Sequence, residues 1–186
     1  RGLNPTGTME RLQGEQHLNR YQLEHILRAA GSIADQSEFI VIGSQAILGA
    51  YPDAPDSLLV SIEADLYPKH NPGLSDLIDG TIGELSPFHQ TFGYYGHGVG
   101  PETAVLPKDW SERLTAICNE NTRGVTGWCL HPTDLAYSKL AAGRPKDLDY
   151  VRQLRQHGIL DERALIELIA STSDPLKENL EARFKV

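Results

Sequence analysis

The sequence predicts an α/β (α+β) fold in which a mixed sheet flanked by helices is followed by a C-terminal helical region, and three observations carry this prediction. Two short β-rich apolar runs, residues 39–42 and 58–67, enclose a segment of helix-forming residues. From His131 onwards helical periodicity continues through four segments separated by Gly or Pro. The chain of 186 residues can bury one core without disulfides or a structural metal. We therefore place the core at residues 9–130 and the helical region, packed on it, at residues 131–186.

The charge distribution restricts the class of partner. The net charge is −8 and comes from the first part of the chain: residues 1–137 carry 8 Lys and Arg against 17 Asp and Glu, whereas residues 138–186 carry 9 against 8. Binding to duplex DNA over a broad face needs clustered Lys and Arg, which this distribution disfavours. A narrow site that holds a cation and a few phosphates is compatible with it.

The sequence contains no recognisable targeting segment. No apolar run reaches the roughly 18 residues of a membrane helix, and no secretory leader pattern begins the chain. We therefore expect a cytoplasmic protein that does not contact membranes. Residues 1–8 are rich in turn formers and precede the only methionine, Met9, so we expect them to be a short artificial leader before the native start.

The first elements follow from the spacing of apolar residues. Helical spacing over residues 18–34 predicts a helix that caps the sheet. Residues 39–42 form an apolar run that stops at Gly43, and helix formers return at residues 45–50. This order predicts a strand, a tight turn and a short helix.

The second apolar run, residues 58–67, alternates in polarity. Successive side chains of a strand point to opposite faces, so Glu63 and Asp65 share one face and the apolar residues between them share the other. The later core elements are predicted to be a helix that opens at Asn71, a hairpin formed by residues 92–99 and 102–106, and strands at residues 113–118 and 127–130. The helical region is predicted to contain helices at residues 132–142, 145–157, 162–170 and 175–184.

Gly43 and Ser44 lie at the predicted strand-to-helix turn, where they are suited to bind phosphate. Glycine lets the backbone approach a phosphate, and the Ser hydroxyl and nearby amides donate hydrogen bonds to its oxygens. The paired carboxylates of Glu63 and Asp65 are ligands for Mg²⁺ (or Mn²⁺), which bridges phosphates. Each pattern alone is also typical of a simple tight turn or of a solvated strand face. Their combination, in this order, favours a nucleotide site.

At these residues the sequence resembles the nucleotidyltransferase superfamily. The superfamily signature is an apolar strand, Gly-Ser, a short helix and an acidic-x-acidic strand, which here reads IVIGSQAILG followed by IEADLY. The chain is similar in particular to small bacterial proteins of the DUF6036 group and to AbiE-type toxins of toxin–antitoxin pairs. A second segment, residues 134–151, supports this similarity with the sequence DLAYSKLAAGRPKDLDYV. The resemblance implies a nucleotidyltransferase-like fold, with Gly43 and Ser44 as nucleotide-binding residues and Glu63 and Asp65 as catalytic metal ligands.

The resemblance also assigns roles in the helical region. Asp134 and Lys139 match an Asp-x4-Lys motif, and Arg144, Lys146 and Asp147 match an Arg-x-Lys-Asp motif. It implies that Lys139 is catalytic and binds the triphosphate, that Arg144 and Lys146 add phosphate contacts, and that two acids, Asp134 and Asp147, support these basic groups. Because Asp134 and Lys139 are five residues apart, they do not form an i,i+4 ion pair, so each needs its own partner. A solvated helical face with a charged loop is the alternative.

Several departures from the superfamily pattern limit the chemistry that we expect. Eighteen residues separate Ser44 from Glu63, which requires an extra loop, and the first acid is Glu where Asp is commoner. Many active members carry a third carboxylate on a later strand, but the segment PETAVLPKDW has no acid inside the predicted strand and only Glu102 at its edge. The later Asp of the toxin motif falls one place early, at Asp149. The sequence therefore supports nucleotide binding more directly than catalysis.

Two functions of different classes are compatible with these residues. The first is a metal-dependent nucleotidyltransferase that moves a nucleoside monophosphate from an NTP to a hydroxyl on RNA, protein or a small molecule, with an antitoxin-like protein as a candidate partner. The alternative is a catalytically degenerate nucleotidyltransferase fold that acts as a nucleotide- or protein-binding module. An aminoglycoside-modifying activity has support at the level of the superfamily only.

The remaining patterns indicate structure more than chemistry. The Gly-rich segment FGYYGHGVG lacks the Lys-Ser/Thr of a P-loop, although its Tyr95 and His97 are candidates to line a substrate pocket. The two cysteines lack the spacing of a zinc site. Trp110 and Trp128 are predicted to cover the core or a hairpin, rather than to stack on bases.

Overall fold

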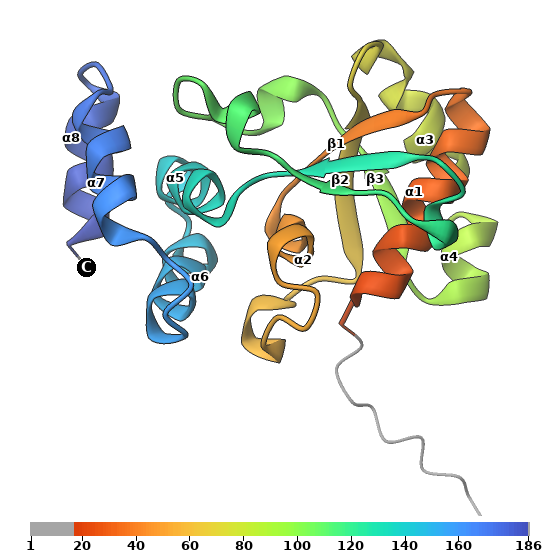
Figure 1. The fold of residues 1–186 in the computed structure, drawn as a ribbon, viewed down its shortest axis with the longest axis horizontal. Helices are drawn as coiled ribbons and strands as arrows, with labels where there is room; N and C mark the ends of the chain where they lie inside the picture. The colour runs from red at the N-terminus through yellow and green to blue at the C-terminus, as the bar shows by residue number, and fades with distance from the viewer. Residues whose placement is uncertain (1–16, 186) are drawn as a thin grey trace, which may run out of the picture.

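The structure is a computed structural model in which residues 17–185 are described, so the predicted leader at residues 1–8 lies outside the described residues. Figure 1 shows a central sheet with helices on both sides and the C-terminal helices gathered at the left. The predicted mixed sheet flanked by helices and followed by a helical region is confirmed. Within residues 17–185, none of the helices has the length and apolar character needed to cross a bilayer.

The sheet has five strands in the order β3-β2-β1-β5-β4. β1 lies at its centre, antiparallel to β2 and parallel to β5, while β3 runs parallel to β2 and β4 runs antiparallel to β5. The strands are β1 (Glu38–Ile42), β2 (Glu63–Pro68), β3 (Tyr95–Gly98), β4 (Thr115–Ile117) and β5 (Thr126–Cys129).

The two faces of the sheet differ in character. On one face Val41 lies opposite Leu66, and both are completely buried. This face packs against α1 (Arg20–Ala34) and α3 (Ser75–Ile82), with the short α4 (Pro87–Phe92) beside them. On the other face Ile42 lies opposite Asp65, and Glu63 is two residues further along β2. The alternation of β2 therefore turns both carboxylates away from α1 and α3.

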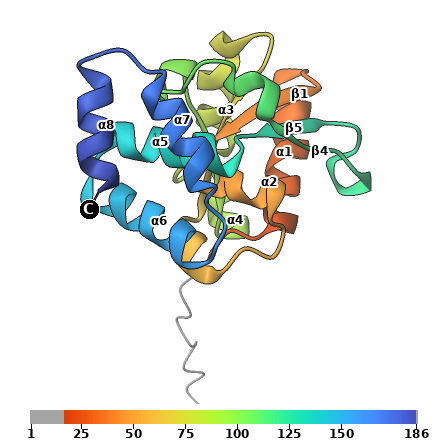
Figure 2. The same ribbon diagram turned by 60° about the vertical axis from the view of Figure 1, so that its left-hand side comes forward.

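The face that carries the carboxylates looks toward the short α2 (Ile47–Ala50) and the C-terminal helices. These are α5 (Pro132–Ala142), α6 (Pro145–Gln156), α7 (Glu162–Ala170) and α8 (Leu176–Phe184). Figure 1 shows α7 and α8 at the left end of the molecule, with α5 between them and the sheet, and Figure 2, in which this side comes forward, shows α5 beside α8. The end of α5 is tied to α8, because Arg183 Nη1 donates to the carbonyls of Leu140 and Ala141 at 2.7 and 2.8 Å.

The predicted hairpin of residues 92–99 and 102–106 is wrong. Only β3 forms a strand there, and it pairs with β2 rather than with the segment that follows it. Pro101 has no backbone N–H to donate to a ladder, and it begins a single 3₁₀ turn, Pro101–Thr103, that leads the chain away from the sheet. The predicted strand at residues 58–67 also begins later, at Glu63, after a 3₁₀ turn at Asp56–Leu58.

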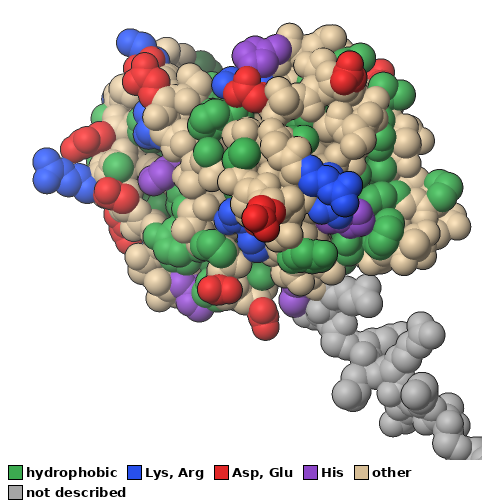
Figure 3. Space-filling model, turned by 45° about the vertical axis from the view of Figure 1, so that its right-hand side comes forward, with side chains coloured by type: hydrophobic (Ala, Val, Ile, Leu, Met, Phe, Trp, Pro, Cys, Tyr) green, Lys and Arg blue, Asp and Glu red, His purple; other side chains and the backbone are tan. Residues whose placement is uncertain are grey.

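On the face that Figure 3 shows, basic side chains occur in small groups and not as a continuous basic surface.

Candidate functional site

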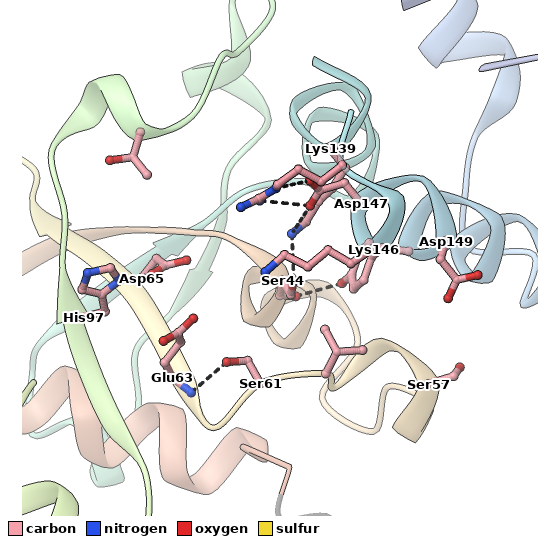
Figure 4. A pocket seen from close by; sticks show the side chains of 14 residues that line it. Ser44, Ser57, Ser61, Glu63, Asp65, His97, Lys139, Lys146, Asp147 and Asp149 are labelled. Atoms are coloured by element: carbon pink, nitrogen blue, oxygen red, sulfur yellow. Dashed lines mark hydrogen bonds and ion pairs between the residues drawn. The ribbon is translucent and has the colours of Figure 1, made fainter. Parts of the chain in front are cut away.

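A cavity of about 470 Å³ lies on the sheet face that carries the carboxylates. β2 and the turn after β1 form one side, and α5 and α6 form the other (Figure 4). Glu63 and Asp65 lie on the β2 side, and the predicted basic residues lie on the helical side. The lining residues are Ser44, Ser57, Val60, Ser61, Glu63, Asp65, His97, Thr103, Lys139, Arg144, Lys146, Asp147, Asp149 and Tyr150.

Gly43 ends β1 in a left-handed backbone conformation, with φ at 73°, which glycine adopts without steric cost. A Cβ atom here would collide with the carboxylate of Asp65. The turn therefore requires glycine both for its conformation and for the space that this carboxylate occupies. Ser44 follows directly and places its hydroxyl at the cavity.

Each carboxylate of β2 has a partner on β3. The register sets Glu63 beside Tyr95 and Asp65 beside His97. The hydroxyl of Tyr95 donates to Glu63 Oε2, and His97 Nδ1 lies 2.8 Å from Asp65 Oδ1. Burial, with a smaller effect of the Glu63 charge, raises the pKa of Asp65 above its ordinary value, although the hydrogen bond with His97 opposes this. Asp65 is thus ionised at a free-energy cost that a bound cation would remove.

Lys139 reaches the Gly43-Ser44 turn from α5. Its Nζ atom donates to Ser44 Oγ at 2.9 Å and lies 3.3 Å from Asp147 Oδ1. Burial lowers the pKa of Lys139, while the Asp147 carboxylate opposes that shift. Tyr150 on α6 donates its hydroxyl to the carbonyl of Ser44 at 2.8 Å. α5 and α6 therefore both hold the turn on which Ser44 lies.

Asp147 organises the basic side of the cavity. Its side chain is 0% exposed and bonds both Lys139, which is 13% exposed, and Arg144, which is 60% exposed. Burial alone would raise the pKa of Asp147, but the hydrogen bonds and charges of Arg144 and Lys139 outweigh it and lower the pKa below its ordinary value. Lys146, from the first turn of α6, points into the cavity (Figure 4).

Asp134 is not brought together with these residues. Its carboxylate is completely buried outside the cavity, and it accepts hydrogen bonds from Arg113 at 2.6 to 3.2 Å. Of the predicted site residues, Asp134 is the one placed elsewhere, because its partner comes from the loop before β4 rather than from α6. Its position indicates that it fixes α5 to that loop.

We therefore expect Asp134→Asn to affect stability and not nucleotide binding. Loss of the charged partner of Arg113 is expected to lower the free energy of unfolding by about 2 kcal/mol, a typical size for a charge-assisted hydrogen bond. Urea denaturation measures this, with Asp109→Asn, an exposed acid near Arg113, as the matched control. A large loss of NTP affinity in the folded variant would contradict this assignment.

The extra loop between Ser44 and Glu63 supplies residues that the sequence motifs do not include. Ser57, Val60 and Ser61 form one end of the cavity, and Ser57 Oγ lies 2.9 Å from His157 Nε2 at the end of α6. The long spacing between Ser44 and Glu63 indicates that an extra loop exists. Spacing alone does not indicate that this loop returns to the site.

The third carboxylate of the superfamily has no counterpart on β3, where Tyr95 and His97 occupy the positions beside the two acids. Glu102 is not among the lining residues. Among residues 17–185 no group of three or more His, Cys, Asp or Glu is arranged as a metal site. Mg²⁺, however, is commonly held by one or two carboxylates together with substrate phosphates. Within the part of the chain that the structure describes, Glu63 and Asp65 each keep one oxygen without a protein partner, so the donor set fits such an ion.

A scan against protein-family models matches residues 21–185 to DUF6036, described as a nucleotidyltransferase of unknown function. The chain belongs to this family. The match includes every residue of the cavity, and it establishes the nucleotidyltransferase kind of this DUF6036 protein without specifying its reaction. No curated protein and no solved structure matches the chain.

Proposed function

We propose that this DUF6036 protein transfers a nucleoside monophosphate from an NTP to a hydroxyl acceptor, with Mg²⁺ or Mn²⁺ held by Glu63 and Asp65. One observation carries the proposal: two carboxylates on β2 face three basic side chains across one cavity. The basic side chains are Lys139 of α5, Lys146 of α6 and Arg144, which directly precedes α6. A triphosphate needs both: cations for its oxygens and carboxylates for the ion that accompanies it.

The residues around Ser44 suit the terminal phosphates of the NTP. The Ser44 hydroxyl accepts a hydrogen bond from Lys139, so its own proton is available for a phosphate oxygen. Lys139 supplies a compact charge beside it, and Arg144, which is 60% exposed, and Lys146 add further donors along the cavity wall. Asp147 holds Lys139 and Arg144 in place before the nucleotide arrives, which reduces the ordering that binding requires.

Glu63 and Asp65 would hold the metal ion that accompanies the NTP. The ion supplies positive charge that stabilises the phosphoryl group during transfer. Tyr95 and His97 fix one oxygen of each carboxylate, which orients the other oxygen toward the cavity. The acceptor hydroxyl then attacks the α-phosphorus and its proton passes to water, while the bond between the α-phosphorus and the bridging oxygen of the β-phosphate breaks and pyrophosphate departs.

The second candidate function is a nucleotide- or protein-binding module without transfer activity. It is favoured by one observation, the presence of Tyr95 and His97 where a third carboxylate would complete the metal site. A toxin–antitoxin role with an antitoxin-like partner stays a prediction under either function.

Transfer of label from α-phosphate-labelled NTPs to total RNA, to protein or to small hydroxyl compounds tests the proposal. We expect labelling that needs Mg²⁺ or Mn²⁺, is abolished by chelation and is lost in Glu63→Gln. Glu84→Gln, an exposed acid outside the cavity, is the matched control. The absence of transfer to every acceptor under every metal would favour the binding module.

Nucleotide binding is tested separately by thermal unfolding. An NTP at about 100 times its dissociation constant is expected to stabilise the fold by about 2.7 kcal/mol when Mg²⁺ is present. The same stabilisation with and without the metal would overturn the role of Glu63 and Asp65 as metal ligands.

A further inference from the structure

A second cavity, of about 410 Å³, lies on the same face of the sheet as the two carboxylates. The segment between β3 and β4 covers it, and its lining is mostly apolar and aromatic. The lining residues are Ile40, Tyr67, Lys69, Pro72, Pro101, Trp110, Ser111, Leu114 and Trp128. The function proposed above makes no use of these residues.

The strand register places this cavity beside the first one. Tyr67, Ile40 and Trp128 form one row across β2, β1 and β5, and Asp65 and Ile42 form the next row. Residues two apart on a strand lie about 6.6 Å apart on the same face. The 3₁₀ turn Pro101–Thr103 separates the two spaces, since Pro101 lines the second cavity and Thr103 lines the first.

The aromatic wall is fixed before any ligand binds. Trp128 Nε1 donates to Glu38 at 2.8 Å, and Lys69 Nζ lies 4.6 Å from the centre of the Trp128 ring. Hydrogen bonds from Lys69, His70 and Trp128 lower the pKa of Glu38 to about 2, so this carboxylate stays charged and keeps its partners. The charges of Lys69 and Glu38 balance, which leaves no net attraction for an ionic ligand.

Tyr67 supplies an unused polar group in the second cavity. Its side chain is only 5% exposed, and among residues 17–185 its hydroxyl has no hydrogen-bond partner, although it lines this cavity. This hydroxyl is not one of the buried polar atoms without a partner, so it opens onto the cavity, where a ligand atom can hydrogen-bond it in place of water. A purely aliphatic ligand would leave the Tyr67 hydroxyl without a hydrogen bond to the ligand. A heteroaromatic ring can stack on tryptophan and at the same time form a hydrogen bond with this hydroxyl.

We propose that this second cavity binds a neutral, planar heteroaromatic ring of the nucleobase kind. This assignment rests on the proposed function: the ring is part of the acceptor molecule, and the hydroxyl of that molecule reaches Asp65 in the adjacent row. The acceptor is then a nucleoside or a nucleoside-containing molecule. Trp110 and Trp128, which the sequence suggested were structural covers, are the stacking walls of this subsite.

Tryptophan fluorescence tests the binding step directly, because Trp110 and Trp128 are the two tryptophans of the chain. Adenosine, added to the full chain without metal, is expected to change this fluorescence in a saturable way. Tyr67→Phe keeps the ring and removes the hydroxyl, and it is expected to weaken adenosine about 3- to 10-fold, the value of one neutral hydrogen bond. Trp110→Ala is expected to weaken it about 10-fold or more, with Trp128 as the remaining reporter.

Two controls test whether adenosine binds in the second cavity. Lys139→Ala alters the first cavity, so adenosine binding that persists in this variant supports the second cavity, and binding that disappears overturns it. Cyclohexanol has a hydroxyl but no aromatic ring. An equal fluorescence response to cyclohexanol would show that the cavity binds apolar molecules without selecting an aromatic ring, and would overturn the inference. Unchanged adenosine affinity in both Tyr67→Phe and Trp110→Ala would also overturn the inference.

The transfer reaction separates this inference from the proposed function. With adenosine as acceptor, Tyr67→Phe is expected to raise the KM for adenosine several-fold and to leave the KM for NTP unchanged. Saturable adenosine binding without any transfer would overturn the proposed function and leave the subsite supported. Transfer to other hydroxyl compounds without adenosine binding would overturn the subsite and leave the proposed function supported.

Discussion

Asp65→Asn is expected to lower the rate of nucleoside monophosphate transfer about 1,000-fold or more. Loss of one of the two carboxylates proposed to hold the metal would remove several kcal/mol of charge stabilisation in the transition state, and about 1.4 kcal/mol corresponds to a factor of ten. Steady-state transfer of labelled nucleotide measures this. Asp53→Asn, an exposed acid outside the cavity, is the matched control and is expected to keep the wild-type rate.

The same variant is expected to be at least as stable as the wild type. Burial raises the pKa of Asp65 in the folded state, so ionisation of this group opposes folding once the pH exceeds its ordinary pKa of 3.8. Asn carries no charge and avoids that cost. The stability difference should therefore be absent at low pH, grow as the pH rises from the ordinary pKa of 3.8 to the raised pKa of the folded state, and stay constant above it. A variant that is inactive because it is unfolded would contradict this explanation.

Asp147→Ala is expected to have the largest effect on stability, a loss of about 3 kcal/mol. Removal of one partner of a buried pair commonly costs about 3 to 5 kcal/mol. Lys139 is only 13% exposed, so it would keep an uncompensated buried charge in this variant. Arg144 is 60% exposed and can be solvated, so we expect a cost at the lower end of this range. Urea denaturation measures the change, and NTP affinity is expected to fall as well, because Lys139 and Arg144 lose the carboxylate that positions them.

Asp149→Ala provides a close control for that variant. Asp149 lies two residues further along α6 and also lines the cavity, but its side chain is 61% exposed and pairs with Arg152, which is itself 43% exposed. An exposed ion pair contributes at most about 1 kcal/mol, so little change is expected. Equal losses in the two variants would show that Asp147 has no special role in holding the basic residues.

The parts of the site that local sequence determines could be predicted. Gly43 is required by the backbone of one turn, and the alternation of a strand is enough to put Glu63 and Asp65 on one face. Helical segments in the last third follow from their periodicity and from the Gly and Pro residues between them. These features depend on neighbours within a few residues along the chain.

The parts that depend on distant partners could not be predicted. The sequence near Asp134 gives no sign that Arg113, 21 residues earlier, is its partner. Residues 102–106 have strand-like composition, but β2 already pairs with β1 and β3, and Pro101 turns the chain away. The loop at Ser57 reaches the cavity because it packs against α6, a contact that spacing does not encode.

The tie between Arg183 and the end of α5 has a mechanical consequence. Arg183 bonds the carbonyls of Leu140 and Ala141, the two residues that follow Lys139, so α8 and the lysine at the Ser44 turn share one rigid connection. A load that draws α8 outward would leave both carbonyls without these donors, at a cost of about 1 kcal/mol each, and would loosen the turn from which the lysine extends. The position of α8 is thus mechanically coupled to the end of the cavity where Ser44 and Lys139 lie.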